Sequence, residues 1–106
     1  MKQVSLTALS HATFAGLLNT RFRVRPTGRE ALELELIEAT AKPSGAERAP
    51  APVRSFSLVF TGPPDPFLPQ RTYPFEHEKL GAFDLFIVPI GKVEKGFLYE
   101  AVFNSV

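Results

Sequence analysis

The sequence has no cysteine and no tryptophan, and only one methionine among its 106 residues. The absence of cysteine excludes disulfides, thiolate-bound zinc, iron–sulfur clusters and thiol catalysis. The formal net charge of +1 is too close to zero to indicate a nucleic-acid or membrane partner. The composition, with 44% hydrophobic and 22% charged residues, is typical of one soluble globular domain, which we assign to residues 1–106.

Long apolar runs are also missing. The longest, Leu85 to Ile90, has the length of a strand and contains Pro89, whereas a membrane span needs roughly 20 apolar residues. Polar residues interrupt any signal-peptide core soon after Lys2: Ser5, Thr7, Ser10 and His11. We therefore expect a cytoplasmic protein without a membrane partner, and secretion by a route that needs no signal is the alternative.

The first element is predicted to be a short helix. Ser10 is a suitable N-cap, and Phe14, Leu17 and Leu18 follow at helical spacing on one face. Asn19 suits the left-handed residue that often ends a helix.

From Arg21 onward the hydrophobic period changes to two, which is typical of strands, and a turn at Pro26-Thr27-Gly28 joins two such segments. One register buries the apolar side chains of both: Val24 opposite Leu32, Phe22 opposite Leu34, Arg23 opposite Glu33 and Arg21 opposite Glu35. A shift by one residue would bury the charges, so the register should be well specified.

Six alternating segments are predicted to be strands: Arg21 to Arg25, Leu32 to Leu36, Arg54 to Thr61, Arg71 to His77, Phe83 to Ile90 and Phe97 to Phe103. Their short connections favour a mainly β fold, a small six-stranded antiparallel barrel or sandwich with one short N-terminal helix. The segment Phe83 to Ile90 is apolar on both faces, so we expect both to be covered, one of them by the N-terminal helix. Gly91 to Gly96 is predicted to form a hairpin loop, and Ala41 to Pro52, with three prolines, an exposed loop.

Several motifs together resemble a family of small bacterial proteins catalogued as a domain of unknown function. They are Phe14-x-x-Leu17-x-x-x-x-Phe22-x-Val24, Phe56-Ser57-Leu58-x-Phe60-x-Gly62-Pro63, Leu68-Pro69-Gln70-x-Thr72-Tyr73, His77, Leu80-Gly81-x-Phe83-x-Leu85-Phe86-x-Val88-Pro89 and Tyr99-Glu100-Ala101-Val102-Phe103-Asn104. The resemblance covers the whole chain, and the last two motifs are its most specific part. It implies an accessory role in a phage-tail-like assembly and no catalytic residues.

His77 is the first candidate for a functional site. With Glu76 and Glu78 it forms a run of metal-ligand residue types, which Asp84 or Glu100 on neighbouring strands would complete. Consecutive strand residues point to opposite faces, however, so Glu76 and His77 do not easily share one ion. The alternative is a strand-end histidine bonded to nearby backbone or to a carboxylate, and we expect no metal and no cofactor.

Glu100 is the second candidate, because a single acid in an apolar stretch is suited to acid–base catalysis. Such a residue more often caps backbone amides or pairs with an arginine, here Arg54 or Arg71. General acid–base catalysis also needs a partner group, and none stands at a suitable spacing. We therefore expect no enzymatic activity from Glu100 or His77.

Arg21, Arg23 and Arg25 project from one strand face, with Phe22 on the opposite face. Aromatic and basic side chains must share a face to bind a single strand of nucleic acid. Two facing glutamates also neutralise this stripe. We therefore expect a salt-bridged surface and no nucleic-acid partner.

Two proline-rich segments, Pro43 to Pro52 and Pro63 to Pro69, are candidates for protein contact. Phe67 and Leu68, flanked by prolines at a loop tip, are predicted to be exposed apolar anchors. The alternative is that Phe67 folds back onto the core.

The preferred hypothesis is a small non-enzymatic β-domain that acts through protein contacts, as an accessory, adaptor or assembly factor. Its partner would be another protein or a second copy of the chain. The alternative is a small barrel that binds an apolar ligand in a lumen lined by the inward-facing Phe and Leu side chains. A third, less favoured hypothesis is an enzyme that uses Glu100 or His77.

Overall fold

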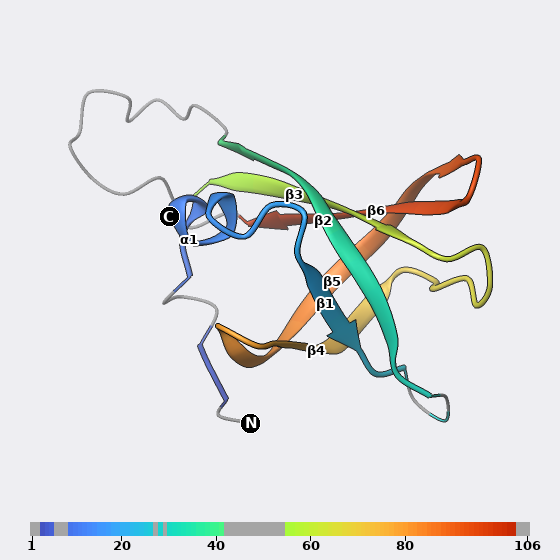
Figure 1. Cartoon of the computed structure of the whole chain (residues 1–106), viewed down its shortest axis with the longest axis horizontal. Helices are drawn as coiled ribbons and strands as arrows, with labels where there is room; N and C mark the ends of the chain where they lie inside the picture. The colour runs from blue at the N-terminus through green and yellow to red at the C-terminus, as the bar shows by residue number, and fades with distance from the viewer. Residues whose placement is uncertain (1–2, 6–8, 27, 29, 42–54, 104–106) are drawn as a thin grey trace.

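The computed structural model describes residues 3–5, 9–26, 28, 30–41 and 55–103, which form a closed antiparallel barrel with one short helix (Figure 1). The elements are α1 (His11–Ala15), β1 (Arg21–Val24), β2 (Leu32–Ala41), β3 (Phe56–Gly62), β4 (Arg71–His77), β5 (Gly81–Val93) and β6 (Gly96–Phe103). The strands follow the order β1-β2-β3-β6-β5-β4 around the barrel. The predicted fold class is confirmed, and of its two forms the barrel is the one observed.

Helix α1 begins at the predicted cap. The Ser10 hydroxyl accepts a hydrogen bond from the Thr13 amide at 3.3 Å, and the Thr13 hydroxyl accepts one from the Ser10 amide. The helix ends at Ala15, with Gly16 as its C-cap, earlier than the apolar spacing predicts. Asn19, at φ 66°, is left-handed as predicted, and its amide donates to the Leu36 carbonyl at 2.7 Å. The early end leaves Leu18 exposed.

The register of β1 on β2 is the predicted one, with Phe22 opposite Leu34 and Val24 opposite Leu32. Alternation specifies it because Phe22, Val24 and Leu34 are all fully buried. The observed ion pair runs diagonally across the strands, from Arg21 Nη1 to Glu33 Oε1 at 3.2 Å, instead of to Glu35 directly opposite.

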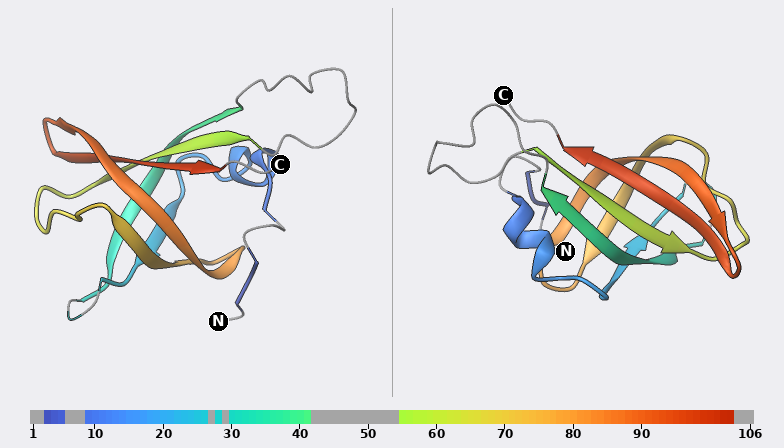
Figure 2. Two further views of the ribbon diagram at one scale, coloured as in Figure 1. Left: turned by 180° about the vertical axis from the view of Figure 1, so that it is seen from behind. Right: turned by 90° about the horizontal axis from the view of Figure 1, so that it is seen from above.

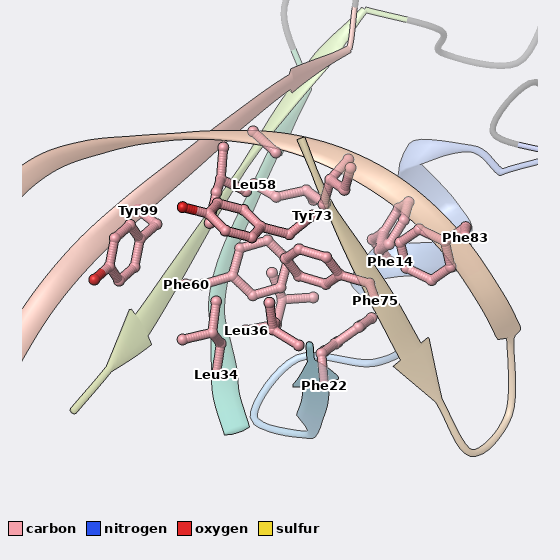
Figure 3. Packing of buried hydrophobic residues seen from close by; sticks show 14 of the residues in the cluster. Phe14, Phe22, Leu34, Leu36, Leu58, Phe60, Tyr73, Phe75, Phe83 and Tyr99 are labelled. Atoms are coloured by element: carbon pink, nitrogen blue, oxygen red, sulfur yellow. The ribbon is translucent and has the colours of Figure 1, made fainter. Parts of the chain in front are cut away.

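The barrel interior is filled by side chains (Figure 3). Six phenylalanines are at most 1% exposed: Phe14, Phe22, Phe56, Phe60, Phe75 and Phe83. Helix α1 lies at the end of the barrel where β6 finishes, away from the β5–β6 turn (Figure 2), and its Phe14 is fully buried. Its ring centroid lies 5.9 Å from that of Phe56 and 5.5 Å from that of Phe103. The helix therefore closes one end of the barrel with an aromatic side chain.

The prediction that both faces of β5 are covered is wrong. Phe83 and Ile87 face the core, but the outward-facing Phe86 is 48% exposed. The reason is the position of α1, which packs beside β2, where the His11 ring Nε2 lies 3.0 Å from the Ala39 carbonyl oxygen. A helix that closes the barrel end does not also lie on the outside of β5.

Smaller differences concern turns. The hairpin after β5 is tighter than predicted, because the strands run to Val93 and from Gly96 and leave a two-residue turn. Pro74 lies where the short β1–β4 pairing ends, and only its carbonyl is used there, by the Arg25 amide at 3.1 Å. The loop predicted over Ala41 to Pro52 lies, from residue 42 onward, outside the described residues. In the described part of the chain, no helix has the length and apolar character needed to cross a membrane.

Candidate functional site

His77 ends β4 and is buried, 4% exposed. Its Nδ1 accepts a hydrogen bond from the Lys79 amide at 3.0 Å, so the proton of the neutral ring is on Nε2. Nε2 therefore donates to the Thr20 hydroxyl at 2.9 Å, and that hydroxyl donates to the Leu17 carbonyl at 2.6 Å. Burial lowers the pKa of His77 below its ordinary value, because it disfavours the charged ring.

His77 is therefore a strand-end histidine bonded to nearby backbone, which was the alternative to a metal ligand. Both ring nitrogens already have protein partners, and Glu76 is directed to Arg25, with Oε1 3.0 Å from its Nε. No three His, Asp or Glu side chains of the described residues are grouped so that they could hold a metal ion.

A surface hollow of about 490 Å³ lies beside His77. Arginine and lysine side chains line it together with glutamates: Arg21, Arg23, Lys79, Glu33, Glu76 and Glu78. The aromatic ring of the adjacent Phe22 is fully buried on the other side of β1. The hollow is therefore lined by equal numbers of basic and acidic side chains, and the Phe22 ring is not among its lining residues.

Glu100 lies on the outer side of β6, between the buried Tyr99 and Ala101. It is opposite Val59 of β3 and Val88 of β5. No ion pair joins it to Arg71 or to another described residue, and Arg54 lies outside the described residues. It is a partly exposed carboxylate without an acid–base partner in the described structure.

The two predicted anchors, Phe67 and Leu68, differ in exposure. Phe67 is 47% exposed and contacts the Phe97 ring edge-on, with centroids 4.9 Å apart. The prediction that Leu68 is exposed is wrong, since it is 1% exposed. Its amide donates to the buried Tyr99 hydroxyl at 3.0 Å, which holds this part of the chain against the core. Burial also raises the pKa of Tyr99.

The outer side of the β5–β6 hairpin carries a group of apolar side chains that sequence reasoning did not identify as a site. We call it the β5–β6 face. It consists of Phe86, Val88, Val93, Leu98, Glu100 and Val102, together with Ile90, which is the extra residue at the register shift between Pro89 and Gly91. Phe86, Ile90 and Val102 are 48–49% exposed and Val93 is 37% exposed. Scattered exposed apolar residues are ordinary, but a contiguous group on one face is typical of an interaction surface. The signal was present in the sequence as a strand apolar on both sides.

Residues 9–103 match the family described as Domain of unknown function (DUF6916). The chain belongs to this family. The DUF6916 match runs from just before α1 to the end of β6, so it includes the barrel, the helix that closes it and the whole β5–β6 face. No curated protein and no solved structure matches the chain.

Proposed function

We propose that this DUF6916 domain is a non-enzymatic protein-contact module whose contact surface is the β5–β6 face. It would serve as an accessory, adaptor or assembly factor in the cytoplasm, and a phage-tail-like assembly is the setting that the family resemblance suggests. The observation that carries the proposal is the set of four large apolar side chains left 37–49% exposed on one hairpin.

The physical argument is the free energy that covering this face would release. Burying a Val, Ile or Phe side chain fully is worth roughly 1.5–3 kcal/mol, so covering a half-exposed one is worth about 1 kcal/mol. Phe86 adds an aromatic ring, the residue type enriched at the centres of interfaces. A hairpin whose strands are already paired also has less conformational entropy to lose when it binds.

The alternatives have less support. A barrel for an apolar ligand needs an empty lumen, but the interior of this six-stranded barrel is occupied by phenylalanine rings in contact with one another, as for Phe22 and Phe60 at 5.4 Å. An enzyme needs a reactive group with a partner, whereas His77 has both nitrogens in structural hydrogen bonds and Glu100 has no second catalytic group among the described residues.

The test is capture of bound proteins from a lysate of the native host with the tagged wild type and with two serine variants. Phe86→Ser and Ile90→Ser each remove an exposed side chain from the face. The matched controls are Leu18→Ser, just after α1, and Ile37→Ser, on β2. Their side chains are 38% and 37% exposed, which is similar to the exposure of the side chains on the β5–β6 face. The melting temperature of each variant shows that it is folded.

We expect a protein captured stoichiometrically by the wild type and by both controls to be lost from Phe86→Ser and Ile90→Ser. Equal capture by all five proteins would contradict the proposal, because the β5–β6 face would then contribute nothing to binding.

A further inference from the structure

Glu100, on the β5–β6 face, has aliphatic neighbours on its own strand and on both strands beside it. Val59 and Val88 stand directly opposite on the two neighbouring strands. Leu98 and Val102 are the next residues on the same side of β6, since strand side chains alternate. Directly opposed residues bring their Cβ atoms to about 5 Å. Residues two apart on one strand lie about 7 Å apart, so all four are close to any group that contacts Glu100.

A partner that covers this face would take the Glu100 carboxylate out of water. Removing an ionised carboxylate from water costs several kcal/mol unless an opposite charge or hydrogen-bond donors replace the water. Among the described residues no ion pair involves Glu100; the two pairs observed join Arg21 to Glu33 and Arg25 to Glu76. Within the part of the chain that the structure describes, nothing neutralises Glu100, so a covering partner would have to bring the compensating charge.

The basic residues nearest in the fold do not lie on the face. Lys92 is opposite Phe97, whose ring packs against Phe67 and the core, so the Lys92 side chain belongs to the other side of the hairpin. Lys95, in the turn, lines a hollow with Glu33 and Glu35. Within the described residues, a second copy docked face to face would therefore bring another carboxylate to Glu100 and no cation.

We propose that the partner of the β5–β6 face is a different protein, which presents one lysine or arginine, flanked by apolar side chains, to Glu100. This inference rests on the proposed function and specifies the chemistry of the partner. The apolar residues supply the attraction and Glu100 selects among apolar surfaces, because an uncharged or acidic one would leave the carboxylate buried and unpaired.

The test uses a phage-displayed library of random peptides as the probe. Wild-type protein, Glu100→Lys and Phe86→Ser are each used for selection, and Glu94→Lys, which changes an exposed carboxylate in the hairpin turn, is the matched control. Peptides selected on the wild type are then synthesised with their basic residue intact or changed to Glu, and their affinities are measured for each protein.

We expect the wild type and Glu94→Lys to select apolar peptides with one basic residue, and Phe86→Ser to lose them. Changing that residue to Glu should weaken binding to the wild type at least tenfold, and Glu100→Lys should restore at least tenfold to the changed peptide. This charge reversal separates a direct pair from a general effect of net charge, because Glu94→Lys changes the net charge equally.

Three results would overturn the inference. Peptides that depend on Phe86 but carry no basic residue, or show no charge reversal, would reject the ion pair and leave the proposed function standing. A failure to select any peptide that depends on Phe86 would reject both. Sedimentation of the wild type as a dimer that Phe86→Ser dissociates would identify a second copy as the occupant.

Discussion

At the scale of single residues, the clearest feature is the chain of hydrogen bonds from Lys79 through His77 and Thr20 to Leu17. Every donor in this chain has an acceptor as long as the histidine is neutral. A proton on Nδ1 would displace the Lys79 amide. The chain joins the end of β4 to the segment between α1 and β1. Sequence reasoning placed His77 at a strand end but not at this junction, because Thr20 is 57 residues away and its contact depends on barrel closure.

This feature predicts a pH dependence of stability. Burial lowers the pKa of His77 below 6.5, with Lys79 adding to this effect and Glu78 opposing it. As the pH falls through 6.5, the unfolded chain therefore takes up the proton before the folded one does, and the free energy of unfolding decreases. It levels off once the pH is below the folded-state pKa. Urea denaturation at about pH 7.5 and about pH 5 measures this loss.

The control is His77→Gln, which cannot titrate in this range. We expect this variant to be less stable than the wild type at neutral pH and to lose less stability on acidification. An equal loss in both proteins would show that another group is responsible.

At the scale of elements, the alternation of apolar residues and the turn residues predicted the features that depend on neighbouring residues in the chain. The β1–β2 register is one of these features. Each of the two strands has one apolar face that must be buried, and both faces can be recognised in the sequence. The coverage of β5 was predicted wrongly because a strand with two apolar faces indicates only that something covers the outer one. Whether that cover is the chain's own helix depends on where α1 packs, and this is set by Phe14 entering the barrel end beside Phe56 and Phe103.

The tight hairpin between β5 and β6 predicts a sharp effect of one methyl group. A Cβ at Gly96 would collide with the backbone carbonyl of Gly62, whereas a Cβ at Gly91 would meet only Leu98 Cδ1 at 4.0 Å. The carbonyl belongs to the β3 ladder and cannot move without breaking strand pairing. We expect Gly96→Ala to lower the free energy of unfolding by roughly 1–3 kcal/mol or more, and Gly91→Ala to change it little, by urea denaturation. Similar losses in the two variants would contradict this account of the hairpin.

At the scale of the whole molecule, the filled interior and the apolar exterior belong together. Eight of the ten phenylalanines follow Ser55, and the barrel has room inside for only part of this aromatic content. Phe67 and Phe86 remain about half exposed outside it. The composition indicated an aromatic core but not its capacity, which depends on strand number and closure. The same limit on interior volume leaves apolar side chains on the exterior of the barrel.

The filled interior predicts how the molecule responds to small apolar ligands. Phe14 is fully buried and contacts rings from β1, β3, β5 and β6. Phe14→Ala should therefore cost roughly 3–5 kcal/mol and leave an apolar cavity at the barrel end. Such cavities stay dry and bind molecules of the size of benzene.

In a thermal-shift assay with benzene or indole, we expect no rise in melting temperature for the wild type and a rise for Phe14→Ala. Binding at 100 times the dissociation constant would restore about 2.7 kcal/mol. The control Leu18→Ala, which truncates an exposed side chain on the same segment, should respond as the wild type does. A rise in the wild type itself would mean that the barrel opens to admit a ligand, and the apolar-ligand hypothesis would then replace protein contact as the better account of this fold.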